Sequence, residues 1–252
     1  MNKILLIGCN GRMGQAVTTA ASAQTDLSIV AGVDIHATNS GTYPVYPSLA
    51  MVREKADVII DFSHPSGLED ALKYATDAGL PIVMATTGLD AEQLGLLANA
   101  SGDVAVLRSA NMSVGVNLLI DLVVKAARAL YKDFDMEIIE KHHNQKLDAP
   151  SGTALAIADA INAALDPVKM DIVHDRHGQN TKRTNHEIGI HAVRGGTLAG
   201  EHTVLFAGRD ELLEIRHTAI SRTIFAEGAL AAARFLIGKA PGFYTMRDMF
   251  SE

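Results

Sequence analysis

Short apolar runs alternate with helical patterns along the first half of the chain. The apolar runs cover residues 4–7, 27–33, 58–60, 80–84 and 104–107; the helical patterns cover 15–23, 66–78 and 91–100, with Ser66 as a candidate N-cap. Short runs without polar positions are typical of strands that are buried on both faces. Repeated strand–helix units therefore predict a doubly wound parallel sheet of the α/β class with right-handed crossovers.

The pattern changes in the second half. Helices are predicted over 114–130, 154–165 and 222–237, and strands over 186–193, 201–207 and 212–217. Short connections between these strands predict antiparallel hairpins or a meander. In the strand 186–193, Ile188, Ile190 and Ala192 alternate with Glu187, Gly189 and His191, so one face should be buried, in the chain or against another subunit. The last helix is expected to pack back on the first half.

One long helix should leave the first half of the chain. Its apolar positions form a single stripe: Val114, Leu118, Leu119, Leu122, Val123, Ala126 and Leu130.

A glycine-rich turn joins the first apolar run to the first helix. Gly8, Gly11 and Gly14 have the spacing G-x-x-G-x-x-G rather than the commoner G-x-G-x-x-G. Such a turn lets a pyrophosphate approach the backbone and the N-terminus of a helix. Asp34 ends the next apolar run, where an acid can bind a ribose diol. A tight turn without a ligand is the alternative, but the acid favours a dinucleotide site.

Ligands of doubly wound sheets bind beyond the carboxyl ends of the strands. The loops after residues 7, 33, 60, 84 and 107 are therefore candidates for the rim of a cofactor site. Thr86, Thr87 and Asn111 lie in these loops; ordinary turn and capping interactions are the alternative for them.

Composition narrows the class of protein. The 252 residues are 48% hydrophobic and 20% charged, as in globular domains, and the net charge of -7 argues against general binding to nucleic acid or an anionic membrane. No run approaches the roughly 20 apolar residues of a membrane span, and the apolar run 4–7 is too short for an export signal. The single cysteine, Cys9, excludes an intrachain disulfide and indicates a reducing compartment. We expect a cytoplasmic protein.

Residues 137–153 concentrate chemical groups in one loop. His142, His143 and Lys146 are followed by Gly152 and Thr153, where a helix begins. Acid–base groups beside a helix N-terminus predict an active site with an anion-binding end. Zinc binding is the alternative for adjacent histidines, but no cysteine is near and neighbouring side chains of an extended chain point apart, so we expect no metal.

These patterns predict two domains. Residues 1–113 and 220–252 should form a Rossmann-type dinucleotide-binding domain. Residues 114–219 should form a smaller α+β domain with a mixed or antiparallel sheet, for substrate binding and oligomerisation.

Four segments together resemble the dihydrodipicolinate (4-hydroxy-tetrahydrodipicolinate) reductase family of lysine and diaminopimelate biosynthesis. They are residues 8–14 (GCNGRMG), 109–117 (SANMSVGVN), 137–155 (EIIEKHHNQKLDAPSGTAL) and 188–208 (IGIHAVRGGTLAGEHTVLFAG). The resemblance spans nearly the whole chain, and the third segment is close to diagnostic. It implies NAD(P)H-dependent reduction of 4-hydroxy-tetrahydrodipicolinate, a dicarboxylate ring, to tetrahydrodipicolinate. It also implies a homotetramer whose second-domain sheets join at the centre.

The resemblance assigns roles to the matching residues. It implies that His142 is the catalytic acid and Lys146 the catalytic lysine, with His143, Gly152 and Thr153 binding substrate. The implied cofactor contacts are Gly8, Cys9, Asn10, Gly11, Arg12, Met13, the ribose acid Asp34, then Ala85, Thr86 and Thr87, and finally Ser109, Ala110, Asn111 and Met112. Imidazole suits proton transfer near neutral pH, and positive groups offset two carboxylates. Domain closure is expected, because the implied cofactor contacts and the implied catalytic and substrate-binding residues lie on different domains.

Two departures from the family pattern concern the cofactor. Ile35 stands where well-known members have an arginine for the 2′-phosphate of NADPH, so we predict that NADH is preferred. His36 or Arg12 could still support NADPH. Met112 stands where an aromatic side chain is common, and a modest effect is expected.

Two other functions fit parts of the sequence. A dinucleotide-sensing regulator without turnover needs no proton donor, and a related two-domain dehydrogenase, such as one acting on aspartate, would share only the first domain. Arg176 and Arg183 lie in the polar loop 175–184 and are either substrate or interface contacts or solvated charges. His191 and His202 are strand residues without an assigned role.

Overall fold

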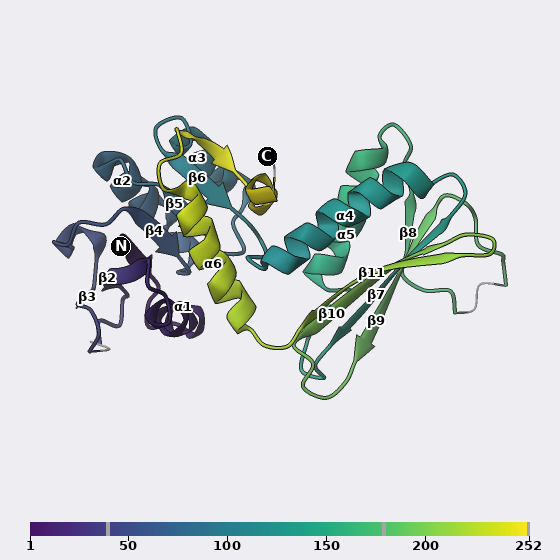
Figure 1. The fold of residues 1–252 in the computed structure, drawn as a ribbon, viewed down its shortest axis with the longest axis horizontal. Helices are drawn as coiled ribbons and strands as arrows, with labels where there is room; N and C mark the ends of the chain where they lie inside the picture. The colour runs from purple at the N-terminus through teal and green to yellow at the C-terminus, as the bar shows by residue number, and fades with distance from the viewer. Residues whose placement is uncertain (39–40, 178–179, 251–252) are drawn as a thin grey trace. The chain divides into compact units, whose positions relative to one another are not determined.

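The computed structural model describes residues 1–38, 41–177 and 180–250; the polar loop 175–184 and the last predicted domain segment each include residues outside these ranges. The chain divides into two compact units (Figure 1). One comprises Met1–Val114 and the chain from Thr223 onward, and the other comprises Gly115–Arg222. Among the described residues, no helix is both long and apolar enough to span a membrane.

The first unit contains a seven-stranded parallel sheet. The strand order is β12-β6-β5-β4-β1-β2-β3. The strands are β1 (Asn2–Ile7), β2 (Leu27–Val33), β3 (Val45–Tyr46), β4 (Val58–Asp61), β5 (Ile82–Met84), β6 (Ala105–Arg108) and β12 (Gly242–Tyr244). The predicted Rossmann-type sheet is confirmed. The two edge strands, β3 and β12, were not predicted, because two or three residues carry too little pattern to be recognised.

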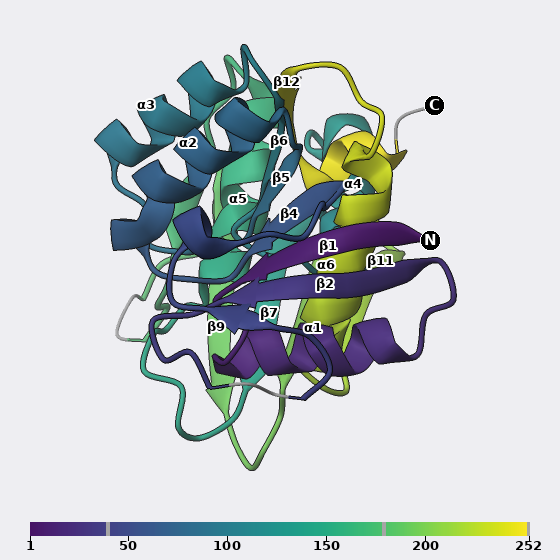
Figure 2. The ribbon, with the colours of Figure 1, turned by 90° about the vertical axis from the view of Figure 1, so that its left-hand side faces the viewer.

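Helices cover both faces of this sheet (Figure 2). They are α1 (Arg12–Ser22), α2 (Leu68–Ala78), α3 (Ala91–Ala100) and α6 (Thr223–Leu236), with short 3-10 turns at Leu49–Met51, Pro65–Gly67 and Met246–Phe250. Ile4 and Leu6 of β1 pack in one core with α1 and α6, while Leu5 and Ile7 pack in another with α2 and α3. This two-sided burial explains the wholly apolar runs. The prediction that the last helix returns to the first half is confirmed.

The predicted N-cap of α2 is wrong. The 3-10 turn Pro65–Gly67 precedes α2, and the N-cap of α2 is Gly67. Ser66 instead donates its backbone N–H to Nδ1 of His64, at 3.2 Å.

The second unit contains a mixed five-stranded sheet covered on one face by two helices. The strand order is β11-β10-β7-β9-β8. The strands are β7 (Asp135–His142), β8 (Asp171–Val173), β9 (Glu187–Arg194), β10 (Gly200–Ala207) and β11 (Leu212–Ala219); the helices are α4 (Val114–Leu130) and α5 (Gly152–Leu165). Strand β9 is parallel to β7 and β8, whereas β10 is antiparallel to β7 and β11. The predicted mixed sheet is confirmed.

The predicted meander is only partly correct. Strands β10 and β11 form a hairpin, but β7 lies between β9 and β10. The connection from β9 to β10 therefore crosses the end of β7, and its backbone is hydrogen-bonded there: Gly195 N donates to His142 O at 2.9 Å, and His143 N donates to Leu198 O at 2.8 Å. A short connection can join two neighbouring strands or two strands that flank a third. The length of the connection from β9 to β10 therefore did not reveal that β7 lies between them.

The predicted apolar stripe of α4 is partly wrong. Leu118 and Leu122 are exposed, while Leu119 and Val123 are buried in the core of the second unit. Helix α4 is apolar over most of its circumference, so periodicity alone could not choose the buried face. Similarly, Ala192 is exposed although Ile188 and Ile190 on the same face of β9 are buried.

Candidate active site

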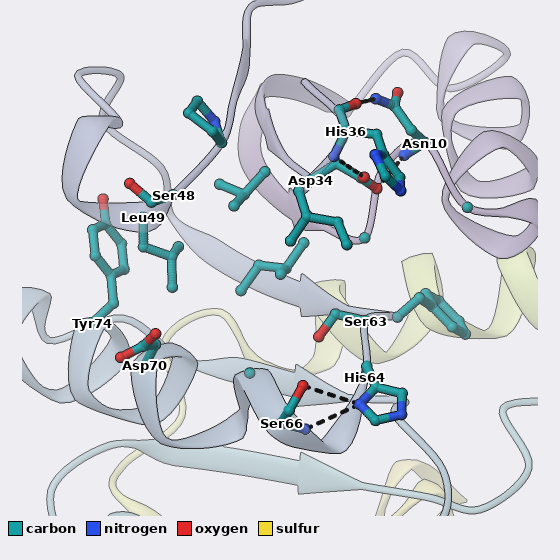
Figure 3. A pocket seen from close by; sticks show the side chains of 18 of the residues that line it. Asn10, Asp34, His36, Ser48, Leu49, Ser63, His64, Ser66, Asp70 and Tyr74 are labelled. Atoms are coloured by element: carbon teal, nitrogen blue, oxygen red, sulfur yellow. Dashed lines mark hydrogen bonds between the residues drawn. The ribbon is translucent and has the colours of Figure 1, made fainter. Parts of the chain in front are cut away.

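A cavity of about 1120 Å³ opens beside the glycine turn of the first unit (Figure 3). The loops after β1, β2, β3 and β4 and residues along α2 line it. It includes four of the predicted cofactor residues, Gly8, Asn10, Gly11 and Asp34. The parallel strands place these loops at one edge of the sheet, as expected for a ligand site.

The glycine turn is built for close backbone approach. Gly8 has φ +76, and a Cβ there would lie 2.7 Å from the carbonyl oxygen of Phe62. A Cβ on Gly14 would overlap the carbonyl oxygen of Gly8. Gly11 is the N-cap of α1 and supplies no side chain to the first N–H groups. A pyrophosphate therefore fits this turn and the positive end of α1.

Asp34 connects the glycine turn to the loop after β2. Its Oδ2 accepts from Asn10 N and its Oδ1 accepts from His36 N, both at 3.0 Å. The side chain of Asn10 in turn donates to His36 O at 2.6 Å and to Thr38 Oγ1 at 3.1 Å, as Figure 3 shows in part. Each carboxylate oxygen has lone pairs for further donors, so the acid can also accept from a ribose diol.

The other predicted cofactor residues do not line this cavity. Cys9 and Met112 are buried in the core, with Met13 packed against it. The hydroxyl of Thr86 donates to the buried Asp61 at 3.2 Å, and burial raises the pKa of Asp61. The other predicted cofactor residues that do not line the cavity are Arg12, Ala85, Thr87, Ser109, Ala110 and Asn111.

A buried ion-pair cluster surrounds His142 in the second unit. Side chains alternate along β7, so Glu140 and His142 lie on the same face as the core residues Met136 and Ile138. Glu140 is fully buried, and its Oε2 lies 2.6 Å from Nδ1 of His142. Arg194 at the end of β9 donates to both carboxylate oxygens, at 2.7 Å each.

The charges of this cluster set its protonation. Burial would raise the pKa of Glu140, but hydrogen bonds from Arg194, His142 and the backbone of Ser151 outweigh it and lower the pKa. Burial lowers the pKa of His142; Glu140 opposes this, and the positive charges of Lys146 and Arg194 add to it. At neutral pH the ring is therefore neutral. Its single proton lies on Nδ1, because a carboxylate can only accept.

A second buried histidine lies beside the first. His202 of β10 meets His142 edge to face, with the ring centroids 5.2 Å apart. Burial lowers the pKa of His202 to about 4, and His142 adds to the effect. Ser151, the N-cap of α5, accepts from Ala154 N at 3.2 Å, and its hydroxyl is hydrogen-bonded to Nε2 of His202 at 2.9 Å.

The remaining predicted substrate residues follow in the same loop. Lys146 Nζ lies 2.8 Å from Oδ1 of Asp148, and Lys146 N donates to His143 O at 3.2 Å. Gly152 and Thr153 are the first residues of α5. The structure therefore brings the positive groups and a helix N-terminus into one connection between β7 and α5.

Three residues around His142 were not predicted as members of the site: Glu140, Arg194 and His202. A signal for Glu140 was present, since residues two apart in a strand share a face. No local signal connects Arg194 or His202 with the loop.

Arg176 and Arg183 are not isolated solvated charges. Arg183 Nε donates to Glu137 at 3.0 Å, and Arg176 donates to Glu187 at 2.7 Å. His191 also pairs with Glu137, at 2.8 Å. Glu137 lies on the sheet face opposite to Glu140, so this cluster is separate from the one around His142.

A Rossmann-type unit with a glycine turn, in one chain with a unit that holds a buried histidine–carboxylate pair, is typical of nicotinamide-dependent oxidoreductases. The chain matches the family described as "Dihydrodipicolinate reductase, N-terminus" over residues 2–112 and "Dihydrodipicolinate reductase, C-terminus" over residues 115–250. It belongs to the dihydrodipicolinate reductase family.

Curated relatives and a solved structure agree with this membership. The 4-hydroxy-tetrahydrodipicolinate reductase of Clostridium tetani is 47% identical, covering 100% of this chain and 98% of the relative. The reductase of the same name from Caldanaerobacter subterraneus subsp. tengcongensis is 51% identical, covering 100% and 99%. A dipicolinate-bound dihydrodipicolinate reductase from Paenisporosarcina sp. TG-14 superposes with a TM-score of 0.81 at 26% identity, covering 97% of both chains.

Proposed function

We propose that this protein reduces 4-hydroxy-tetrahydrodipicolinate to tetrahydrodipicolinate in lysine and diaminopimelate biosynthesis. The observation that carries the proposal is the buried His142, held by Glu140 at the start of the connection that also contains Lys146 and the N-terminus of α5. These groups suit a dianionic ring that must gain a proton. The names of the relatives and the dipicolinate-bound neighbour support the same substrate class.

We assign cofactor binding to the first unit, and substrate binding and oligomerisation to the second. Gly8, Gly11 and the N-terminus of α1 would hold the pyrophosphate, and Asp34 would hold the adenosine ribose. The loops after β5 and β6, which contain Thr86, Thr87 and residues 109–112, would hold the rest. A bound reduced nicotinamide supplies the hydride.

In the second unit, His142 delivers the proton that balances the hydride. Reduction of the C=N–C=C system leaves an enamine-like nitrogen system with excess electron density, and an imidazolium donates a proton to it. Lys146 and His142 offset the two carboxylates electrostatically, and His143 also binds substrate. The backbone N–H groups at Gly152 and Thr153 bind one carboxylate at the start of α5.

We propose that NADH is preferred over NADPH. Asp34 carries a negative charge at the cavity wall, and the next residue, Ile35, offers no positive charge to a 2′-phosphate. Repulsion between this carboxylate and the 2′-phosphate weakens the binding of NADPH. His36 also lines the cavity and would support residual use of NADPH when protonated.

We also propose a cytoplasmic homotetramer. Strand β11 is an edge strand with exposed Leu212 and Leu213, which a second copy would cover. Light scattering of the purified protein should give four times the 26.8 kDa chain mass. The single cysteine agrees with a reducing compartment.

The test of the function is oxidation of NADH and NADPH with substrate generated in situ from pyruvate and aspartate semialdehyde by the upstream synthase. Turnover that depends on the synthase is expected, with a larger kcat/KM for NADH. A folded protein that binds NADH without turnover would instead favour a sensor, or a dehydrogenase for another substrate such as aspartate. Family membership argues against both alternatives.

A further inference from the structure

Glu140 is an unusual residue for a β-strand core. It is fully buried, yet its carboxylate receives hydrogen bonds from Arg194, from Ser151 N at 3.0 Å and from the ring of His142. Burying a charge is costly unless it is paired. The pair with Arg194 satisfies the carboxylate, and the contact with His142 is then additional to what burial requires.

We propose that Glu140 and Arg194 are positioning residues for His142: the carboxylate fixes the ring proton on Nδ1 and leaves Nε2 to exchange protons with substrate, while Arg194 limits how firmly the carboxylate holds a second proton on the ring. This inference rests on the proposed function for its catalytic meaning. The hydrogen-bonded arrangement itself does not depend on it.

The geometry gives each residue a separate task. Oε2 of Glu140 faces both Nδ1 of His142 and Nη1 of Arg194, whereas Oε1 faces Nη2 of Arg194 and the N–H of Ser151. Among the described residues, these hydrogen-bond partners of the carboxylate are Arg194, Ser151 and His142. Because an ionised carboxylate can only accept, the ring must present Nδ1–H to it. The other ring nitrogen, Nε2, lies next to Gly200, where a Cβ would come within 3.0 Å. A glycine at this position leaves room for the ring.

The charged groups around His142 come from several elements. Glu140 belongs to its own strand, Arg194 to β9, and Lys146 to the following loop, where Asp148 pairs with it. His202 of β10 is kept neutral by burial, and His217 of β11 adds to the lowering of its pKa. Glu140 is therefore the negative group that stabilises an imidazolium at His142, while Lys146 and Arg194 oppose it.

A dianionic ligand changes this balance. In the unliganded protein the ring is neutral, so it lacks the proton that a general acid must deliver. The carboxylates of the substrate add negative charge beside Lys146 and favour protonation of His142. Burial keeps the resting ring neutral and Lys146 and Arg194 add to this effect, whereas Glu140 makes the cation accessible when substrate binds.

Glu140→Gln tests the positioning directly. The amide oxygen must face Ser151 N and Arg194, so the amide NH₂ faces Nδ1 and forces the proton to Nε2. Nitrogen-15 NMR of labelled histidine, with His142 assigned from His142→Gln, should show the proton on Nδ1 in the parent protein and on Nε2 in the variant. We expect kcat to fall about 10²–10⁴-fold, as when an analogous orienting carboxylate or general acid is lost.

Arg194→Gln and Glu140→Gln should shift the pKa of His142 in opposite directions. Its loss removes a positive charge, so the pKa of His142 rises and the alkaline limb of kcat/KM moves to higher pH. Glu140→Gln removes a negative charge, so the pKa of His142 falls and that limb moves to lower pH. If Glu140 and Arg194 only stabilised the fold, the two variants would not shift the alkaline limb in opposite directions.

Glu137→Gln is the matched control. Glu137 is also a carboxylate of β7 that is held by arginines and a histidine, but it lies on the other face of the sheet. It should leave the tautomer and the alkaline limb unchanged, and Arg194→Lys should restore most of the parent behaviour. An unchanged Nδ1–H signal in Glu140→Gln, or shifts of both variants in one direction, would overturn the proposal. If the parent protein shows no turnover, the proposed function fails, while NMR and histidine titration still test Glu140 and Arg194.

Discussion

The carboxylate of Asp148 lies 2.8 Å from the ammonium group of Lys146. Lys146 lowers the pKa of Asp148 most, and a hydrogen bond from the backbone N–H of Gly152 lowers it further. Asp148 therefore engages two of the groups to which we assign a carboxylate of the substrate. On the proposed function, a carboxylate of the substrate would have to displace Asp148 from these groups.

Asp148→Asn should consequently strengthen binding of dicarboxylates. An ion pair whose carboxylate is largely exposed contributes roughly 0–1 kcal/mol, so we expect KM to fall about 2- to 5-fold with little change in kcat. Calorimetric titration with dipicolinate should show a similar decrease in Kd. Gln145→Ala, in the same loop, is the control. A higher KM in Asp148→Asn would mean that Asp148 instead holds Lys146 in its productive position.

His142→Gln should reduce kcat about 10²–10⁴-fold, the usual range for loss of a general acid. The Kd of NADH should stay within about twofold, because His142 belongs to the unit without the glycine turn. His143→Gln should raise KM more than it lowers kcat. Steady-state kinetics and fluorescence titration of NADH measure these effects. Unaltered turnover in His142→Gln would remove this residue from the mechanism.

Ile35→Arg should shift the cofactor preference toward NADPH. Ile35 is 84% exposed and lines the cavity, so the substitution should cost little stability. A charge-assisted hydrogen bond to the 2′-phosphate is worth about 1.5–3 kcal/mol, which corresponds to roughly a tenfold or larger rise in the NADPH/NADH ratio of kcat/KM. Ile35→Gln, without the charge, is the control. An equal ratio in both variants would place the 2′-phosphate away from this position.

His202 should make the fold sensitive to mild acid. Its pKa falls from 6.5 to about 4 in the folded protein, so the unfolded chain binds more protons between these values and stability decreases as pH falls through this window. The full loss is about 3 kcal/mol.

His202→Gln should flatten that dependence while keeping a side chain that can accept from Ser151. Thermal unfolding at pH 7 and pH 5 should show a smaller decrease in Tm than in the parent protein. His191→Gln, on the other face of the sheet, should retain the parent slope. Identical slopes for all three proteins would show that His202 is not the group responsible.

Much of the fold followed from local patterns. The apolar runs around Ile4 and Ile59 predicted strands buried on both faces, because only such strands lack polar positions. The order of the sheet was harder to predict. The insertion of β7 between β9 and β10 depends on which strands pair, and a short connection is compatible with a hairpin or with a crossing over a third strand's end.

The site residues likewise fall into those that the local sequence indicates and those that only strand pairing brings into the site. The sequence by itself determined where the chemical groups are concentrated, from Gly8 to Asp34 and from His142 to Thr153, because turns, helix starts and acid–base residues are encoded over a few positions. Only the tertiary structure decided which charges meet. Glu140 and Arg194 are 54 residues apart and His202 is farther along the chain. Their contact with His142 exists because parallel β9 and antiparallel β10 flank β7, and such pairing is a property of the whole sheet.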